Sequence, residues 1–376
     1  MKPTLFALTL IVSGCATARP VREPTVMRAR VESVLGESFA ERLDRMTTSP
    51  QSLDLALSLE QERLADGPLF LLVLPLYACA NLVLSETVYR AEALPRMRVL
   101  LDALLSETVA RVGVEDLTRL DQLHDQGTWL GQVALALGVW RLVGGDARDA
   151  RLHAHLVELI TRALRESDGA PLRSYPNLRW SFDTVPALVA LRVWDVVNRR
   201  DTHREVIARA LAWQDGHVDA STGLPGSRME LAGDTFTDVP RGSDLALRIA
   251  LLGQLDPARA RSMYARFVAH FGRTVWGVPA FAEWPDGMVR DADRDSGEIV
   301  MGVGTAATGF GLAAARAVGD DFRADALREA LRRLPSLRAR AGLREGGGDG
   351  SVTRSLAGDV AMFCALTWTD WNVRLR

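Results

Sequence analysis

The chain has 376 residues, enough for one large domain or two of ordinary size, and its 48% hydrophobic and 24% charged residues are normal for a globular protein. Its formal net charge is −2 with acidic and basic residues interleaved, so no basic face indicates nucleic-acid binding. Three cysteines are too few for a disulfide framework and argue against a Cys/His metal site. Cys79 and Cys364 lie in apolar segments, where we expect buried free thiols; one bridge between them is the alternative in an oxidising compartment.

The N-terminus has the parts of a secretory signal peptide. Lys2 precedes an apolar run over residues 5–12, and small residues follow before Cys15. The run is shorter than the roughly 20 residues that a membrane-spanning helix needs. The sequence Val-Ser-Gly-Cys that ends at Cys15 resembles the lipobox of bacterial lipoproteins, in which the cysteine is lipidated and becomes the first residue of the mature protein. An ordinary signal peptide with an incidental cysteine is the alternative.

The lipobox predicts a signal peptide over residues 1–14, a lipidated linker over residues 15–24 and a single domain over residues 25–376. A lipid on Cys15 makes the membrane a partner of the chain. Ala16 is not the aspartate that tends to retain lipoproteins at the inner membrane of enteric bacteria. We therefore expect an outer-membrane lipoprotein that faces the periplasm.

Residues 69–84 are almost wholly apolar and could be mistaken for a second membrane anchor. Pro75 and Asn81 interrupt the run, and polar residues follow from Ser85 onward. A buried core helix explains the segment better than a second anchor does.

The rest of the chain predicts helices at a regular spacing, with almost no alternating strand pattern. Apolar helices rich in small residues begin roughly every 55 to 60 residues, a period that indicates a repeated supersecondary unit. Their starts lie near Leu69, Gly127, Asp183, Gly242, Gly302 and Ser355. An amphipathic, arginine-rich helix follows each of the first five, over residues 94–111, 147–164, 204–213, 257–271 and 322–334. Gly-Asp and Asp-Pro turns join several pairs and are typical of helix ends.

This pairing predicts an all-α (α/α)6 toroid. One helix of each pair is apolar on all sides and its partner has one polar face, so the apolar helices belong inside a ring of partners. A helix over residues 25–43 would close the ring beside the unpaired last helix; an open α-solenoid is the alternative. The long connections over residues 166–182, 215–241, 272–299 and 335–354 would then meet around the mouth of a central cavity. Loops of this length in a compact domain are usually functional.

Three stretches resemble the inner helices and loops of known six-hairpin toroid proteins. They are residues 127–146, which begin Gly127-Thr128-Trp129; residues 174–184, which contain Trp180-Ser181-Phe182-Asp183; and residues 291–320, which contain Asp295-Ser296-Gly297. The groups that they resemble are the linalool dehydratase/isomerase-like proteins and the catalytic domain of glucuronyl C5-epimerases. The resemblance implies the toroid fold over most of residues 69–370. The first group is associated with active-site cysteines, whereas no cysteine of this chain lies on a predicted mouth loop.

Asp183 is the first candidate catalytic residue. It follows an aromatic run and opens an apolar helix, which would place its carboxylate at the cavity mouth with Tyr175 and Trp180 as stacking surfaces for a sugar ring. The alternative is a helix N-cap, a position where aspartate is favoured.

The loop over residues 215–241 offers His217 and Arg241 as substrate-binding residues. His217 stands between Asp215 and Asp219, and an adjacent carboxylate is what fixes the tautomer of an imidazole base. A solvated turn is the simpler interpretation of the same residues.

The loop over residues 272–299 has aromatic side chains interleaved with carboxylates, a combination that suits carbohydrate. Trp284 is a candidate for sugar stacking, and Glu283, Asp295 and Glu298 join Asp183 as candidates for a general acid and base. The alternating aspartates at 291–295 also suggest calcium, but the residues that an EF-hand loop needs at its sixth and twelfth positions are absent. We therefore expect no metal site.

Residues 302–311 are rich in glycine, but no predicted strand precedes them and the segment has no lysine. Neither the phosphate-binding loop of nucleotide-binding proteins nor the dinucleotide-binding glycine motif therefore applies, and we expect no cofactor. Three functions are left open. The first is a cell-envelope enzyme that acts on a glycan by carboxylate acid/base chemistry, as a hydrolase, lyase or epimerase. The second is a non-catalytic lipoprotein that binds a glycan or a partner, and the third is a lyase or isomerase of a small apolar substrate.

Overall fold

The computed structural model describes residues 25–63, 66–121, 125–231, 235–292, 296–340 and 356–371. These residues form fourteen α-helices and three small antiparallel sheets, which confirms the all-α prediction. The segments predicted as signal peptide and linker, with Cys15, lie outside the described residues, as does Asp295.

The alternation of apolar and amphipathic helices is present as expected. Six apolar helices, which we call the core helices, are α4 (Gly67–Ser85), α6 (Gly127–Leu142), α8 (Thr184–Val197), α10 (Gly242–Gly253), α12 (Thr305–Val318) and α14 (Leu356–Thr367). The helices that follow the first five are α5 (Arg90–Val112), α7 (Ala150–Glu166), α9 (Arg204–Gly216), α11 (Pro257–Phe271) and α13 (Asp321–Arg340). The start of α11 follows directly from its sequence, because Asp256 accepts hydrogen bonds from the N–H groups of Ala258 and Arg259, and Pro257 opens the helix.

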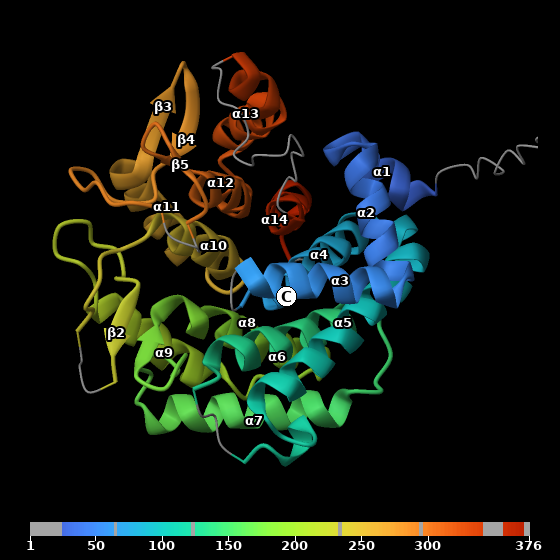
Figure 1. The fold of residues 1–376 in the computed structure, drawn as a ribbon. Helices are drawn as coiled ribbons and strands as arrows, with labels where there is room; N and C mark the ends of the chain where they lie inside the picture. The colour runs from blue at the N-terminus through green and yellow to red at the C-terminus, as the bar shows by residue number, and fades with distance from the viewer. Residues whose placement is uncertain are drawn as a thin grey trace, which may run out of the picture.

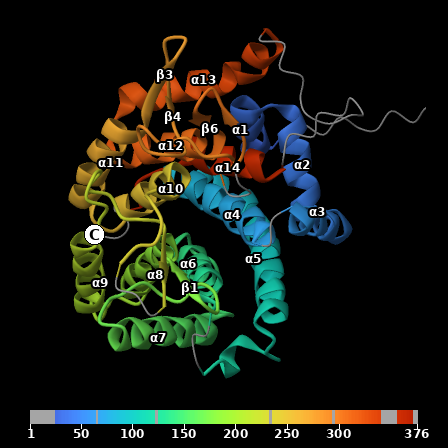
Figure 2. The same ribbon diagram turned by 60° about the vertical axis from the view of Figure 1, so that its left-hand side comes forward.

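The core helices contact one another in chain order, and the last of them, α14, also contacts α4. The order of contacts therefore returns to its start (Figures 1 and 2). In three of the five pairs the second helix packs against two core helices: α5 contacts α4 and α6, α7 contacts α6 and α8, and α11 contacts α10 and α12. Side chains of these helices form most of the hydrophobic core of the domain.

Helix α4 is the one described helix that is long and apolar enough to cross a membrane. It contacts α3 (Pro50–Arg63), α5, α6 and α14, and 89% of its apolar window is buried inside the protein. Its environment is that of a core helix, as the sequence predicts. Cys79 in α4 and Cys364 in α14 are buried free thiols, and burial raises the pKa of Cys79 to about 12.

The N-terminal segment packs beside α14 but is not one helix. The helix expected over residues 25–43 is instead α1 (Val26–Leu35) and α2 (Glu37–Thr48), which meet at Gly36, where a φ of +89° ends the first helix. Phe39 contacts Phe363 of α14, with ring centroids 5.6 Å apart, and Arg42 forms an ion pair with Asp359. The first and last described segments of the chain thus lie together (Figure 1).

Three short β-ladders were missed by the sequence analysis. Strand β1 (Leu178–Trp180) pairs with β2 (Arg228–Glu230), β3 (Gly272–Val275) with β4 (Val278–Phe281), and β5 (Ile299–Val300) with β6 (Val303–Gly304). The last two are hairpins with two-residue loops, Trp276-Gly277 and Met301-Gly302, in which all four φ angles are positive. Gly302 therefore belongs to a hairpin loop, and α12 begins at Thr305 rather than near Gly302 as expected.

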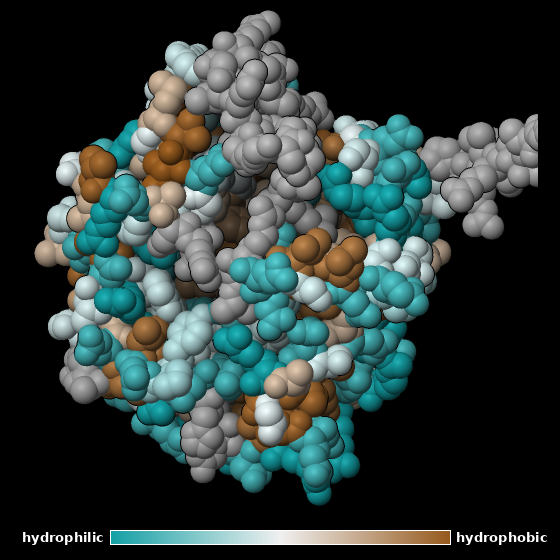
Figure 3. Space-filling model, viewed as in Figure 1, coloured by the Kyte–Doolittle hydropathy of each residue, from teal (hydrophilic) through white to brown (hydrophobic). Residues whose placement is uncertain are grey.

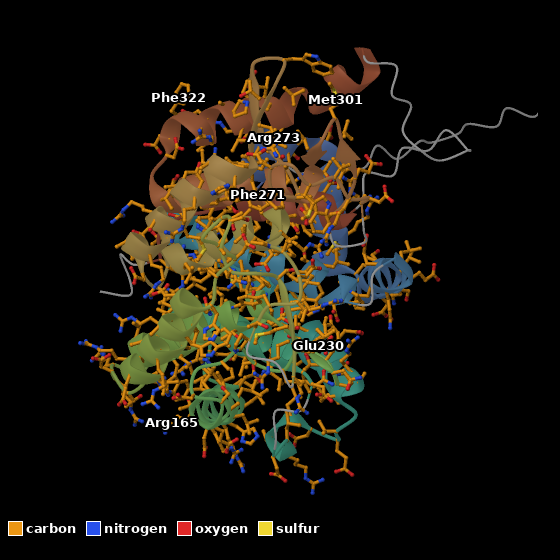
Figure 4. All side chains as sticks on the ribbon, turned by 90° about the vertical axis from the view of Figure 1, so that its left-hand side faces the viewer. Arg165, Glu230, Phe271, Arg273, Met301 and Phe322 are labelled. Carbon is orange, nitrogen blue, oxygen red and sulfur yellow. The ribbon has the colours of Figure 1, made fainter. Side chains whose placement is uncertain are left out.

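The face of the molecule in Figure 3 is mostly hydrophilic, with hydrophobic residues in separate groups and at the bottom of a hollow near the centre. The two hairpins with two-residue loops are at the top of Figure 4, where Arg273 and Met301 are labelled. Trp276 and Met301 at their tips are exposed.

Candidate functional site

Buried charged residues gather where several core helices begin. Asp66 precedes α4, Asp183 precedes α8, and Arg241 and Asp244 flank the first residues of α10. Glu283 reaches the start of α10 from the segment that follows β4. We call these five residues the carboxylate cluster.

Asp183 is held between α6 and the loop before α8. Thr128 in the first turn of α6 donates a hydrogen bond to one carboxylate oxygen, and Ser174 is a second hydrogen-bond partner. The predicted alternative, a helix N-cap, is not what the structure has. Asp183 has helical backbone angles of −61° and −22°, and its side chain makes no capping hydrogen bond to α8.

The carboxyl group of Asp183 keeps its proton to an unusually high pH. Burial is the largest cause and raises its pKa to about 7. Hydrogen bonds from Ser174 and Thr128 oppose this change, and the charges of Asp66 and Asp244 add to it. A helix N-terminus contributes only about 0.3–1 kcal/mol toward the charged form, so burial decides the protonation state of Asp183.

Asp66 is a member of the cluster that sequence reasoning missed. Its carboxylate accepts a hydrogen bond from the indole of Trp129 at 3.0 Å and forms an ion pair with Arg111 at 3.1 Å. The hydroxyl of Tyr175 also donates to it. Tyr175, predicted as a sugar-stacking residue, is thus attached through Asp66 to the start of α4.

Asp244 forms a buried ion pair with Arg248 one turn later in α10, with two nitrogens of the guanidinium at 3.0 Å from the same oxygen. Burial raises the pKa of Asp244, although the charges of Arg248 and Arg241 oppose it. Arg248 itself is fully buried, and it donates to the hydroxyl of Ser181 at 2.7 Å. This arginine connects α10 to the residues just before Asp183.

Glu283 and Arg241 form the second buried ion pair, at 3.0 Å. Glu283 also accepts hydrogen bonds from the backbone N–H of Ser243 at 3.1 Å and from its hydroxyl at 2.7 Å. It therefore caps the start of α10 from another part of the chain. Burial raises the pKa of Glu283 against the opposing charge of Arg241.

Two tryptophans predicted as sugar-stacking residues contact arginines. The guanidinium of Arg241 lies 5.9 Å from the ring centroid of Trp180 and 5.1 Å from that of Trp284. Arg290 lies 5.1 Å from the same Trp284 ring, which is buried. Trp180 is half-buried, so it offers more surface to a ligand than Trp284 does.

His217, a predicted substrate-binding residue, is not joined to the cluster by any hydrogen bond or ion pair among the described residues. His217 stacks on Trp213, with ring centroids 3.7 Å apart, and its Nδ1 lies 2.6 Å from the Trp213 carbonyl oxygen. Glu298 is exposed at the start of the β5–β6 hairpin. Asp295 falls outside the described residues.

The cluster combines one proton-bearing carboxyl group, Asp183, with three carboxylates that are paired with arginines. Charge interactions connect Asp183 to Asp66 and Asp244, and Asp244 to Arg241. Proton transfer by Asp183 near neutral pH is the chemistry that such an arrangement can perform. Within the described residues, no group of three or more His, Cys, Asp or Glu side chains is placed to hold a metal ion.

No protein-family model matches the chain, and no curated protein is similar to it at a significant level.

Proposed function

We propose that the core helices are the inner ring of an (α/α)6 toroid and that the carboxylate cluster lies at its mouth. The closed order of contacts from α4 to α14 and back to α4 supports the ring. The starts of α4, α8 and α10 carry the cluster, so these three helices direct their N-termini to the same region. The resemblance to linalool dehydratase/isomerase-like proteins and glucuronyl C5-epimerases supports the same fold.

We further propose that the protein acts on a glycan by acid/base chemistry, with Asp183 as the group that transfers the proton. The observation that carries this proposal is the buried carboxyl group whose pKa is about 7, because such a group can both give and take a proton near neutral pH. Tyr175 and Trp180 would contact the sugar beside it. Glu283 and Arg241 would keep the start of α10 in place, and Arg241 would hold the ring of Trp180.

The test is a turnover screen against envelope glycans with wild type, Asp183→Asn and Asp320→Asn. Asp320 is an ion-paired carboxylate at the start of α13 and serves as the matched control. Loss of a general acid or base costs about 10²- to 10⁴-fold in rate, so we expect Asp183→Asn to lose that much and Asp320→Asn to keep its rate. If Asp183 acts as the acid, the wild-type rate falls as the pH rises through about 7. Equal rates for the three proteins would refute the assignment.

A glycan-binding protein without catalysis is the second candidate. The observation in its favour is that Asp66, Asp244 and Glu283 are already engaged by arginines, as expected of residues that keep a binding surface in place. This candidate predicts that Asp183→Asn binds the glycan as tightly as the wild type and that neither turns it over.

We propose that the domain works at the bacterial cell envelope, attached through a lipid on Cys15. Palmitate labelling of cells is expected to label the wild-type protein, and Cys15→Ala is expected to remove the label and release the protein from the membrane fraction. Cys79→Ala is the matched control, because that thiol is buried and should leave labelling unchanged. A labelled Cys15→Ala variant would contradict the lipoprotein proposal.

A further inference from the structure

A groove of about 600 Å³ lies apart from the carboxylate cluster, between α7 and the turn that joins α8 to α9. Its walls include Arg162 and Arg165 of α7, and Arg200, Thr202 and His203 of the turn. The turn follows the C-terminus of α8, whereas Asp183 precedes the N-terminus of the same helix, about 21 Å away at 1.5 Å per residue. Figure 4 labels Arg165 on this part of the surface.

Asp195 holds the turn in one conformation. Its backbone carbonyl accepts the N–H of Arg200 at 2.7 Å, and its carboxylate accepts the N–H of His203 at 2.9 Å and the hydroxyl of Thr202 at 2.8 Å. The carboxylate is buried, so these contacts are shielded from water. Arg200, Thr202 and His203 are therefore presented to the groove as one fixed unit.

The same carboxylate orients the imidazole of His203. Nδ1 of His203 lies 2.8 Å from Asp195 Oδ1, and a carboxylate acceptor places a proton on that nitrogen. Nε2 is then the ring atom left for another partner, and it makes no hydrogen bond within the described residues. His203 is the residue before α9, yet its side chain does not cap that helix.

Two arginines of the groove have no carboxylate partner in the described part of the chain. Neither Arg165 nor Arg200 forms an ion pair among the described residues, whereas Arg204, just beyond the groove, is paired with Asp201 at 2.6 Å. Arg162 donates to the carbonyl oxygen of Asp121 at 2.7 Å. Glu158 and Glu166 line the groove as well, so its charge is mixed and suits a ligand that has hydroxyl groups beside its anionic group.

We propose that this groove is a second ligand site, which binds a small molecule carrying a phosphate or carboxylate group. Arg165 and Arg200 bind the anionic oxygens, Nε2 of His203 accepts a hydrogen bond from a hydroxyl group of the ligand, and Asp195 positions the turn. Guanidinium groups match the geometry of phosphate and carboxylate oxygens. The volume of the groove is in the range of sites for small molecules and exceeds what a single phosphate ion fills.

The test is calorimetric titration of the full chain with inorganic phosphate, glucose 6-phosphate and glucuronate. We expect saturable binding of glucose 6-phosphate or glucuronate that is tighter than the binding of inorganic phosphate. Whichever of these two compounds binds more tightly identifies phosphate or carboxylate as the preferred anionic group. The double variant Arg165→Gln/Arg200→Gln is expected to weaken it at least tenfold. Arg204→Gln removes a neighbouring charge outside the groove and is expected to leave the affinity unchanged.

A second readout does not depend on the arginines. The ¹⁵N resonance of His203 Nε2, assigned by its absence in His203→Gln, is expected to shift on ligand addition in the wild type and in Arg204→Gln. Absence of saturable binding, or equal weakening by Arg204→Gln and the double variant, would overturn the proposal. Neither readout uses the carboxylate cluster, so the result is independent of the function proposed for Asp183.

Discussion

At pH 8, replacement of Asp183 by asparagine is expected to stabilise the protein by about 4 kcal/mol. The pKa of this carboxyl group is about 7 in the folded protein, against an ordinary value of 3.8 for aspartate, and burial is the main cause. The folded state therefore binds more protons than the unfolded state between those two values. Wild-type stability falls as the pH rises from about 4 to about 7 and stays lowered above that range.

Asparagine resembles the protonated carboxyl group in size and does not titrate. The Asp183→Asn variant should therefore match the wild type near pH 4, and the difference between the two should grow through pH 7. Urea unfolding at a series of pH values measures this difference, in which the other titrating groups cancel.

Asp320→Asn supplies a control of opposite sign. Burial acts to raise the pKa of Asp320, but hydrogen bonds from the Arg323 N–H and from Tyr264, together with the charge of Arg323, lower it overall. Its ionised form stabilises the fold, so the asparagine variant should be less stable than the wild type at pH 8. If Asp183→Asn also loses stability at pH 8, the carboxylate of Asp183 is a structural anchor and the acid/base proposal loses its basis.

A stability cost of this kind is typical of functional residues, because selection for folding alone would remove it. The other carboxylates of the cluster are matched by arginines: Asp66 by Arg111, Asp244 by Arg248 and Glu283 by Arg241. Among the described residues, the hydrogen-bond partners of the Asp183 side chain are hydroxyl groups. A contribution to folding stability therefore explains the burial of the other carboxylates of the cluster but not that of Asp183.

The helices could be predicted because their pattern is local and repeated. An apolar helix followed by an arginine-rich one gives the same signal five times, and Asp256-Pro257 marks the start of α11 to the residue. The hairpins were missed because their strands are two to four residues long and their loops contain bulky residues. Trp276 and Met301 occupy positive-φ positions, where asparagine or glycine would have indicated a turn in the sequence.

The site was predicted in part, for a related reason. Tyr175, Arg241 and Glu283 lie in long loops and Asp183 directly follows one, and the structure joins these residues to the starts of the core helices. Asp66 lies before α4 in a short connection after a helix that the sequence analysis did not predict. Asp244 and Arg248 are four residues apart in one helix, a spacing that the sequence shows. The pairs Asp66–Arg111 and Glu283–Arg241 depend on which segments meet in space, and no spacing along the chain encodes that.

The second large effect is expected at His153, on the face of α7 that packs against Trp194. His153 is fully buried, its ring centroid lies 4.8 Å from that of Trp194, and neither ring nitrogen has a hydrogen-bond partner in the described part of the chain. Burial, with a smaller contribution from the charge of Arg141, lowers its pKa to about 3. The unfolded state therefore binds the extra proton below pH 6.5, and stability falls as the pH is lowered from there toward 3.

His153→Leu should remove this acid sensitivity. At pH 4 the variant is expected to gain about 3 kcal/mol over the wild type from the missing titration. Above pH 7 the variant is expected to be more stable by about 1–3 kcal/mol, because the two ring nitrogens without hydrogen-bond partners are removed from the core. His217→Leu is the control, because that ring has a hydrogen-bond partner in the carbonyl of Trp213. If His153→Leu stabilises the protein equally at pH 4 and pH 8, the buried ring does not titrate with folding. If the variant is less stable than the wild type at both pH values, Trp194 and Gly138 leave no room for leucine beside them.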